Sequence, residues 1–236
     1  LVGKWHLGLQ DRHHPTRFGY EHFYGFRSGG NRPSNAVLEV NGRDRRVPGL
    51  LPDVLVDESI RWMTQDDQRP FLLSLHFRAP HSPWLPVARE DWDPFEKLDP
   101  KLPHPDFPGL NIPRVKRMTR EYLASMKSVD RNVGRLLEAL QKRGLSQKTV
   151  VIFSSDHGYN MGHNGIWHKG NGHWVLKSPP AATSRIPRGQ RPNMYDHSLR
   201  VPTAVRWPGV IAPGTVITET VTNLDFFPTI LAMAGV

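Results

Sequence analysis

The sequence predicts an α/β protein with a mostly parallel central sheet sandwiched by helices. Two short apolar runs, residues 71–77 and 149–153, are rich in β-branched and aromatic side chains and predict strands. Between them, residues 119–143 repeat apolar side chains with the period of an amphipathic helix, and Gly144 follows where a helix commonly ends. Strand, helix and strand in this order predict a right-handed crossover between parallel strands. The carboxyl ends of both strands would then lie at one edge of the sheet.

The remaining elements are weaker in the sequence. An apolar strand is expected at the start of residues 1–8, a hairpin at residues 37–42 with Asn41-Gly42 as its turn, and a strand at residues 203–207. Asp53 is expected to cap a helix over residues 54–66.

A last helix should begin at Thr222 or Asn223 and run to Ala234, with Pro228 in its first turn. Residues 85–113 carry repeated prolines and predict a surface loop.

Composition indicates a globular chain. The 236 residues are 38% hydrophobic and 22% charged, enough for one large core or two small ones. No apolar run reaches the roughly 18 residues that a membrane span needs. Cysteine is absent, so disulfide and thiol chemistry are excluded, although this does not fix the compartment.

The net charge of +9 favours anionic partners. Nucleic acid and a sulfated or phosphorylated ester are both candidates. The basic residues are scattered, with small clusters at Arg43, Arg45 and Arg46 and at Arg185, Arg188 and Arg191. Because no nucleic-acid-binding signature accompanies them, we expect a generally basic surface and no nucleic-acid partner.

A polar cluster follows the strand predicted at residues 149–153. Asp156 offers carboxylate oxygens and His157 an imidazole nitrogen, both usual metal ligands, and Gly158 allows a close backbone approach. Lys169 could return a positive charge to the same place. In open α/β sheets, ligands bind beyond the carboxyl ends of the strands. The alternative is a capping aspartate and a hydrogen-bonded histidine in an ordinary loop.

Two further places offer chemistry. Lys4 and His6 are two residues apart, so on an extended backbone they would face the same side and suit an anionic centre. A surface lysine and an unrelated histidine are an equal alternative. His81 follows the strand predicted at residues 71–77 and stands between prolines, which stiffen a loop that could hold a catalytic imidazole. The alternative is a histidine in a proline-rich turn.

Four segments, taken in order, resemble the type I sulfatases of the alkaline phosphatase superfamily. They are Gly3-Lys4-Trp5-His6-Leu7-Gly8; Pro80-His81-Ser82-Pro83; Ser155-Asp156-His157-Gly158-Tyr159 with Gly162-His163 and Trp167-His168-Lys169; and Ser198-Leu199-Arg200-Val201-Pro202 with Trp207-Pro208-Gly209. Residues 223–229 also look like that family's late core helix. Each segment alone is weak evidence, whereas the ordered set covers nearly the whole chain.

The resemblance implies roles for individual residues. Lys4 and His6 would flank the nucleophile and its sulfate adduct, and His6 would help to release sulfate. His81 and Lys169 would contact the sulfate ester, with His81 protonating the leaving oxygen. Asp156 and His157 would be two ligands of a divalent cation, which in this family is usually Ca²⁺. Calcium prefers oxygen donors, so the nitrogen of His157 leaves the identity of the metal open.

The chain departs from the family pattern in one important respect. The family carries a Cys or Ser in a C/S-x-P-S-R motif, matured to formylglycine, and paired aspartates on its first strand. This chain has neither cysteine nor that motif. We therefore expect residues 1–236 to be an internal part of a sulfatase catalytic domain, incomplete at both ends. The nucleophile segment upstream and the C-terminal subdomain would be missing, and the 236 residues alone would be inactive.

The expected function of the whole enzyme is metal-assisted hydrolysis of an organic or carbohydrate sulfate ester. One alternative is a phosphodiesterase or phosphonate monoester hydrolase of the same superfamily, and another is a non-catalytic anion-binding relative. The resemblance is compatible with a periplasmic or secreted protein. The sequence itself leaves the localisation, the particular ester and the oligomeric state open.

Overall fold

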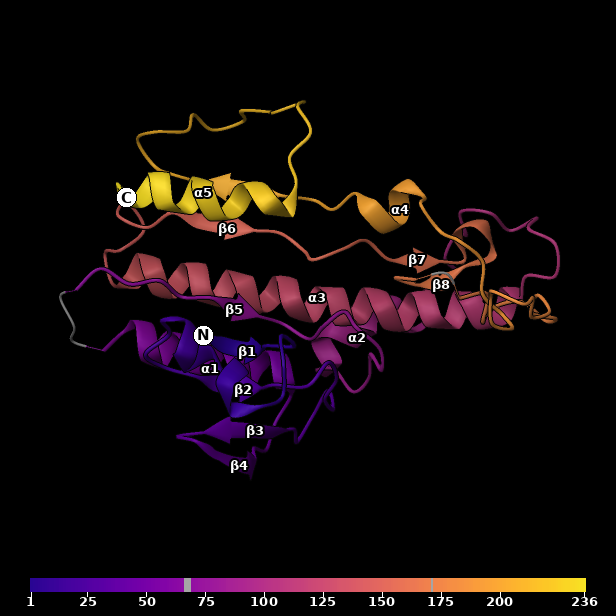
Figure 1. Ribbon diagram of the computed structural model, residues 1–236, viewed down its shortest axis with the longest axis horizontal. Coiled ribbons are helices and arrows are strands. Elements are labelled where there is room, and N and C mark those ends of the chain that lie inside the picture. Colours follow the sequence, from indigo (N-terminus) through magenta and orange to yellow (C-terminus); the bar gives the residue numbers. More distant parts are fainter. Residues whose placement is uncertain (66–68, 171) are drawn as a thin grey trace. The chain divides into compact units, whose positions relative to one another are not determined.

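The computed structural model describes residues 1–65, 69–170 and 172–236 (Figure 1). Two compact units make up the chain. Unit 1 comprises Leu1–Pro105 and Asn111–Ser146, and unit 2 comprises Asp106–Leu110 and Gln147–Val236. No helix of the described residues is long and apolar enough to cross a membrane.

Unit 1 is built on a five-stranded sheet with the strand order β4-β3-β2-β1-β5. Its strands are β1 (Val2–Lys4), β2 (Tyr24–Phe26), β3 (Val37–Val40), β4 (Arg43–Arg46) and β5 (Leu75–His76). β1 lies parallel to both β2 and β5, whereas the pairs β2–β3 and β3–β4 are antiparallel. The prediction of an α/β fold is confirmed, with a sheet that is mixed and flanked by helices.

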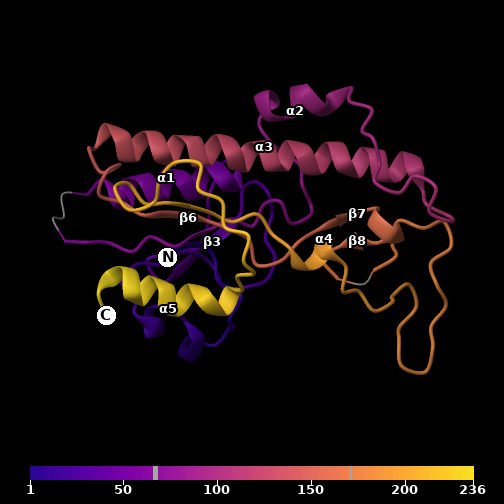
Figure 2. The ribbon, with the colours of Figure 1, turned by 90° about the horizontal axis from the view of Figure 1, so that it is seen from above.

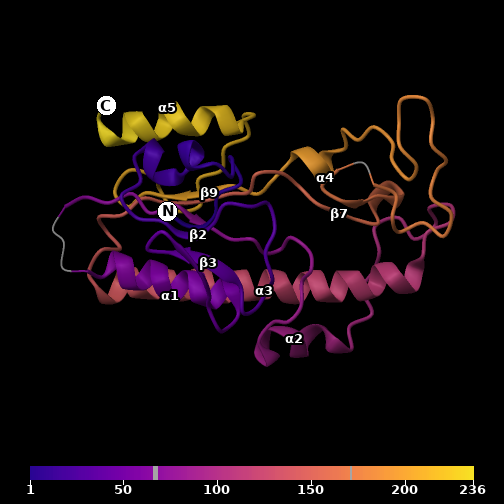
Figure 3. The same ribbon diagram turned by 60° about the horizontal axis from the view of Figure 1, so that its bottom comes forward.

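Three helices belong to unit 1. They are α1 (Leu51–Met63), α2 (Arg89–Glu96) and α3 (Ile112–Lys142), and two short 3₁₀ helices, η1 (Asp11–His13) and η2 (Pro15–Phe18), follow β1. α1 packs on the sheet and on α3, and α2 packs on α3 (Figure 3). α1 thus has one face on the strands and another on α3.

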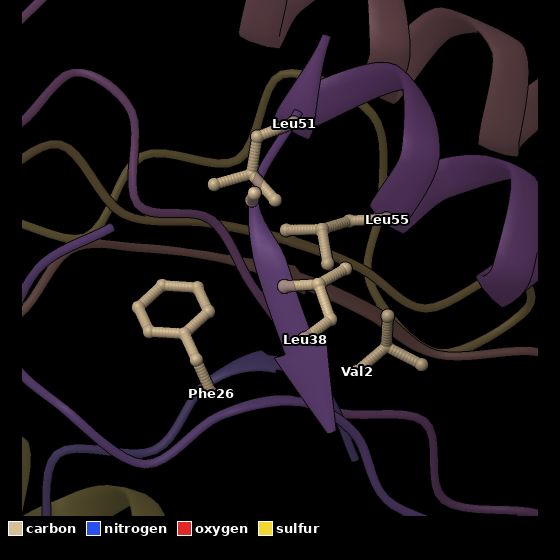
Figure 4. Close-up of a cluster of buried hydrophobic side chains, with 6 residues drawn as sticks. Val2, Phe26, Leu38, Leu51 and Leu55 are labelled. Carbon is tan, nitrogen blue, oxygen red and sulfur yellow. The ribbon is translucent and has the colours of Figure 1, made fainter. Parts of the chain in front are cut away.

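The core of unit 1 lies between the sheet and α1. Leu51 and Leu55 of α1 point toward Val2, Phe26 and Leu38, which come from three different strands (Figure 4). All five side chains are at most 5% exposed. Complete burial of an aliphatic or aromatic side chain of this kind contributes about 1.5–3 kcal/mol, so this cluster holds β1 in place.

Two predicted helices begin earlier than expected. α1 starts at Leu51 with Leu50 as its N-cap, so the prediction that Asp53 caps a helix from residue 54 is wrong. The predicted end at residue 66 lies outside the described residues. α3 starts at Ile112, seven residues before the predicted residue 119. In both cases a proline stands in the first turn, where its missing N–H costs nothing, and Pro113 was included in the loop predicted over residues 85–113.

The prediction of one continuous surface loop over residues 85–113 is also wrong. Residues Arg89–Glu96 form α2, although Pro94 stands inside it. Asp91 of this helix is fully buried, and a tertiary ion pair of that kind overrides the weak helix propensity of the segment.

The predictions of the hairpin turn and of the start of the last helix are confirmed. Asn41 and Gly42 both have positive φ, at 51° and 73°, as a tight β3–β4 turn requires. In unit 2, Thr222 and Asp225 form a capping box at the start of α5 (Asn223–Ala234). Pro228 stands inside α5, beyond the first turn in which it was expected.

Unit 2 contains two small sheets. Its strands are β6 (Val151–Phe153), β7 (Asn160–Met161), β8 (Trp167–His168) and β9 (Ala204–Arg206), and its further helices are η3 (His163–Gly165) and α4 (Asp196–Leu199). β7 pairs with β8 and β6 with β9, both antiparallel. Figure 2 shows the long loop that runs from β8 to α4.

β6 corrects two expectations. Residues 149–153 were predicted to form a buried parallel strand, yet β6 is antiparallel to β9 and Phe153 is 41% exposed. β5 and β6 also belong to different sheets of the described residues, so the predicted crossover within one sheet is wrong. A run of β-branched residues favours a strand but does not select its partner, and β5 is only two residues long.

Candidate functional site

Lys4 is the last residue of β1, and the backbone turns sharply after it. His6 has φ 58°, in the left-handed region, and its N–H donates to the carbonyl of Arg27 at 3.1 Å. The extended backbone on which Lys4 and His6 were predicted to face one side is therefore wrong. The strand register of β1 with β2 ends at Lys4, and the N–H groups of Trp5 and His6 still donate to the carbonyls of Phe26 and Arg27.

The bend after β1 is held by close contacts. A Cβ on Gly29 would lie 2.4 Å from Nε2 of His6, so only glycine leaves room for the imidazole. The indole of Trp5 donates to the carbonyl of His13 at 2.7 Å and packs on Phe18. The exposed imidazole of His6 thus stands on a fixed backbone.

His81 lies in a loop that a buried arginine ties together. Arg78 is 5% exposed and donates from Nη1 to the carbonyl of Ser82 and from Nη2 to the carbonyl of Pro83. Nδ1 of His81 lies 2.7 Å from the carbonyl of Ser82. Because a carbonyl can only accept, Nδ1 carries the proton, which leaves the lone pair of the neutral ring on Nε2. The loop therefore fixes both the position and the tautomer of His81.

In unit 2, Asp156 and His157 follow β6 on a locally hydrogen-bonded loop. Nδ1 of His157 lies 2.8 Å from the carbonyl of Gly158, which assigns the proton to Nδ1 and leaves a lone pair on Nε2. That Nε2 is 3.3 Å from Oδ2 of Asp156, whose side chain is 74% exposed. The amide of Asn223 donates to the carbonyl of Asp156 at 3.2 Å. One carboxylate oxygen and one imidazole nitrogen are thus side by side and accessible.

Lys169 directly follows β8, and a buried asparagine fixes that strand. Asn160 of β7 is fully buried, and its amide donates to the carbonyl of His168 at 3.1 Å and to Oγ of Ser198 at 2.7 Å. The N–H of Gly158 also donates to the carbonyl of Ser198 on α4. Asn160 and Ser198 therefore connect the loop of Asp156 with the strand before Lys169, within the same unit.

The ammonium group of Lys169 makes no hydrogen bond or ion pair with another residue that the structure describes. Its side chain is half-buried. A half-buried cation without a counter-charge among the described residues favours an anionic ligand.

Asp156 and His157 carry two of the donor atoms that a metal site would need. Asp156 and His157 offer two donors that a cation could bridge, and the orientation of His157 by a carbonyl is the usual arrangement for a metal ligand. Within residues 1–65, 69–170 and 172–236, no group of three or more His, Asp or Glu side chains is placed to hold a metal ion. The pair fits a metal as two of its ligands, and further ligands would have to come from other residues.

The six predicted site residues divide evenly between the two units. Lys4, His6 and His81 belong to unit 1, whereas Asp156, His157 and Lys169 belong to unit 2. Lys4 is the last residue of β1, and the other five stand on loops that follow short strands. That all six form one site stays a prediction.

Three supporting residues were missed by the sequence analysis. Arg78, Asn160 and Asn223 each hold a main-chain carbonyl beside a predicted site residue. Asn223 was read only as the start of a helix. The sequence offers one signal for these three residues, which is their position next to motif residues. Their burial and their hydrogen-bond partners depend on the fold and cannot be predicted from the residue types alone.

The chain belongs to the sulfatase family. The family model described as Sulfatase matches residues 1–236, the whole chain. This confirms the resemblance drawn from the ordered motifs.

Curated relatives carry several sulfatase names. The chain is 30% identical to the steryl-sulfatase of Rattus norvegicus, over 86% of this chain and 30% of that protein. It is 29% identical to the choline-sulfatase of Rhizobium meliloti (strain 1021), over 72% of this chain and 33% of that protein. The chain thus spans about a third of the length of these two relatives.

Solved structures share the fold. The chain superposes on Ps i-CgsB with a TM-score of 0.72 and 26% identity, over 99% of this chain and 49% of that one. A protein solved with its substrate D-glucosamine-2-N,6-O-disulfate gives a TM-score of 0.77 at 21% identity, over 100% of this chain and 58% of that one. The phosphonate monoester hydrolase of Silicibacter pomeroyi gives 0.55 at 21% identity, over 87% of this chain and 42% of that one. These neighbours confirm the fold of the alkaline phosphatase superfamily.

Proposed function

We propose that this chain is part of a sulfatase catalytic domain that hydrolyses an organic or carbohydrate sulfate ester. The match of the Sulfatase family model along residues 1–236 carries the proposal. A nucleophile outside these residues belongs to it, since the sequence contains neither cysteine nor a Ser-x-Pro-Ser-Arg segment. Formylglycine is the nucleophile that the family resemblance implies.

Cationic side chains would bind the sulfate group. Lys4 and Lys169 place ammonium groups at the ends of β1 and β8, and both are half-buried. Fixed positive charges facing a developing negative charge are usually the largest contribution to catalysis of this kind. The ammonium group of Lys169 has no partner among the described residues, and this supports its assignment to a sulfate oxygen.

The two histidines of unit 1 would move protons. His81 is held with Nδ1 protonated, so a second proton on Nε2 makes it a general acid for the departing alcohol oxygen. His6, exposed on its bent backbone, would exchange a proton when sulfate leaves.

Asp156 and His157 would hold a divalent cation, Ca²⁺ by family resemblance. When bound, the cation would neutralise charge on the sulfate oxygens. Nδ1 of His157 is fixed by the carbonyl of Gly158, so Nε2 would be the liganding atom. The mixed oxygen and nitrogen donors also suit softer divalent metals.

The substrate would be a small organic sulfate or a sulfated sugar. Ps i-CgsB was solved with k-i-k-neocarrahexaose, and another neighbour with a glucosamine disulfate. Secretion or a periplasmic location belongs to the same proposal, and a Drosophila melanogaster relative is named an extracellular sulfatase.

Hydrolysis of 4-nitrophenyl sulfate tests the proposal. We expect the 236 residues alone to be inactive, and the protein extended by the upstream coding sequence to be active. In the active protein, Lys169→Ala and His81→Ala should each lower kcat/KM by about 100-fold or more. Lys97→Ala is the control, because Lys97 is an exposed lysine at the C-terminal end of α2, and it should leave kcat/KM unchanged. Turnover by the 236 residues, or a higher kcat/KM for a phosphonate monoester, would contradict the proposal.

Metal binding offers a readout that does not depend on activity. Calorimetric titration with Ca²⁺ and with Mn²⁺ should show binding that Asp156→Ala abolishes and that Asp196→Ala, an exposed aspartate of α4, leaves unchanged. Equal binding by both variants would exclude Asp156 as a ligand.

A further inference from the structure

Unit 1 contains a hollow that the proposed catalytic residues do not use. It has a volume of about 530 Å³, and its lining includes Arg32, Arg46, Pro33, Pro48, Leu85 and Pro86. This size falls within the range of roughly 300–1,000 Å³ that is usual for small-molecule sites. Apart from the arginines, its described lining residues are uncharged.

The two arginines make the hollow cationic. Arg46 is exposed on β4, and its Nη1 donates to the main-chain carbonyl of Asn35 at 3.0 Å. This bond orients the guanidinium and leaves further N–H groups to donate elsewhere. The guanidinium of Arg32 is exposed and makes no hydrogen bond or ion pair with another described residue. Two forked donors with a shared hollow suit a sulfate or carboxylate group, which guanidinium binds through paired hydrogen bonds.

The wall that carries Arg46 is preorganised. Asn35 and Gly49 exchange hydrogen bonds, at 2.8 Å from N of Asn35 to O of Gly49 and at 3.0 Å from N of Gly49 to Oδ1 of Asn35. The carbonyl that orients Arg46 is thereby fixed. Because this wall is already fixed, ligand binding would cost the protein little conformational entropy. A low entropy cost of this kind favours affinity at a small site.

The rest of the lining is apolar and stiff. Pro33, Pro48 and Pro86 have fixed rings, and Leu85 is 37% exposed. A sugar ring presents C–H groups on its faces and anionic substituents at its rim. The apolar walls and the two arginines match these two parts of one ligand, whereas they offer no aromatic surface on which a nucleobase would stack.

The hollow adjoins the loop of His81. Leu85 and Pro86 follow His81 by four and five residues. Trp84, which lies between His81 and Leu85, is buried, and its indole donates to the carbonyl of Pro80 at 2.9 Å. The wall of the hollow and the loop that holds His81 are therefore one continuous, tied segment of unit 1. Two lining residues of the hollow thus belong to the same segment of chain as His81.

We propose that the hollow between Arg32 and Arg46 is a subsite for a second anionic group on a sulfated glycan, next to the sugar whose ester is cleaved. The inference rests on the proposed sulfatase function and adds the class of substrate: a chain that carries more than one sulfate or carboxylate group.

The test measures binding of a sulfated uronic acid–hexosamine tetrasaccharide and of its desulfated form by calorimetry. At an ionic strength of about 0.15 M, surface charges are largely screened and a built site is favoured over a diffuse one. We expect the paired variant Arg32→Ala/Arg46→Ala to raise the Kd for the sulfated chain about 10-fold or more, which corresponds to about 1.4 kcal/mol. The desulfated form should bind the unmodified protein at least as weakly as the sulfated chain binds the Arg32→Ala/Arg46→Ala variant.

A matched variant controls for charge. Arg43→Ala/Arg45→Ala removes two exposed arginines of the same strand that do not line the hollow, and it should change the Kd less than about 2-fold, within the small effect of screened charges. Removing Arg46 also removes its hydrogen bond to the carbonyl of Asn35, which could loosen the wall. Arg32→Ala alone removes no described side-chain hydrogen bond and therefore tests the subsite without this effect. Equal losses in both pairs, or no loss in either, would overturn the subsite.

Two further outcomes separate this inference from the others. A single-stranded DNA oligonucleotide that binds more tightly than the glycan through Arg32 and Arg46 would overturn the assignment to a glycan. Turnover of a small monosulfate with no effect of Arg32→Ala/Arg46→Ala on glycan binding would leave the sulfatase function standing and remove the subsite. Loss of glycan binding in that variant, when the protein extended by the upstream coding sequence shows no sulfatase turnover, would keep the subsite and contradict the catalytic function.

Discussion

Arg131 of α3 donates to both carboxylate oxygens of Asp91 on α2, with distances of 3.1 Å from Nε to Oδ1 and 2.8 Å from Nη2 to Oδ2. Asp91 has no exposed side-chain surface. The same Nη2 lies 2.9 Å from Oδ1 of Asp53 on α1. Its hydrogen bond with Asp91 raises the pKa of Arg131, so the guanidinium stays charged at all ordinary pH values. One side chain thus joins helices α1, α2 and α3.

Removing Asp91 should strongly destabilise unit 1. Asp91→Ala leaves Arg131 without its buried partner, and loss of one member of such a pair costs about 3–5 kcal/mol of unfolding free energy. Urea unfolding measures the change. Asp99→Ala is the matched control, because Asp99 is 78% exposed in its ion pair with Lys116 and should cost no more than about 1 kcal/mol. Similar losses for both variants would contradict the central role of Asp91.

The pair of Glu58 with His22 and Arg61 predicts an acid-sensitive contribution to stability. Burial raises the pKa of Glu58, but hydrogen bonds from His22 and Arg61 outweigh this and leave the pKa below its ordinary value of 4.5. The contribution is fully present above 4.5, where the carboxyl group is ionised in both states. As the pH falls below 4.5 the unfolded chain takes up the proton first, and the contribution is lost through the lower pKa of the folded state.

Urea unfolding between about pH 7 and about pH 3 measures this loss, and Glu58→Gln should remove it. Glu21→Gln, at a side chain that is 74% exposed, should leave the pH dependence unchanged. A steeper loss of stability in Glu58→Gln than in the unmodified protein would contradict the assignment.

Two glycines predict opposite effects of the same substitution. A Cβ on Gly158 would lie 2.0 Å from the carbonyl oxygen of His197, so Gly158→Ala must displace the loop of Asp156 or α4, at a cost of about 1–3 kcal/mol. Gly134 stands in α3 with open space around it, and Gly134→Ala should stabilise the protein by about 0.5–1 kcal/mol. Thermal unfolding measures both. An unchanged melting temperature for Gly158→Ala would show that the loop packs differently.

Arg78 should control the rigidity of the His81 loop. Arg78→Met keeps the length of the side chain but removes the guanidinium donors from the carbonyls of Ser82 and Pro83, so that the carbonyl of Ser82 keeps the N–H of His81 Nδ1. Amide hydrogen exchange in residues 79–85 should become faster, with a loss of about 1–3 kcal/mol for the unsatisfied buried groups. Arg89→Met, which breaks exposed ion pairs on α2, should leave exchange in this loop unchanged. Unchanged exchange in Arg78→Met would show that the prolines alone hold the loop.

Local chemistry in the sequence predicted much of the fold. Asn41-Gly42 fixed the β3–β4 hairpin, the capping residues fixed the start of α5, and Gly144 the end of α3. These signals succeed because they depend on near neighbours in the chain. The partner of β6 and the existence of α2 depend on tertiary contacts, such as the buried Asp91, and no short-range pattern carries that information.

The candidate site shows the same division. Ordered motifs pointed to Asp156, His157 and Lys169, and the structure places all three in one unit, tied together by Asn160 and Ser198. The bend at His6 was not predicted, since a left-handed histidine follows no simple residue preference. The buried Arg78 was missed because arginine is almost always exposed unless it is paired.

β4 forms the outer edge of the five-stranded sheet, with β3 as its one partner among the described strands. An outer strand exposes unpaired N–H and C=O groups that can add a strand from another molecule. Here the exposed side chains are three arginines against one aspartate. Two copies that approached through this edge would bring arginine beside arginine, and their repulsion opposes the strand addition from which aggregation begins. The charged side chains of β4 therefore oppose aggregation through the edge of the sheet, and this effect does not depend on the ligand proposed for Arg46.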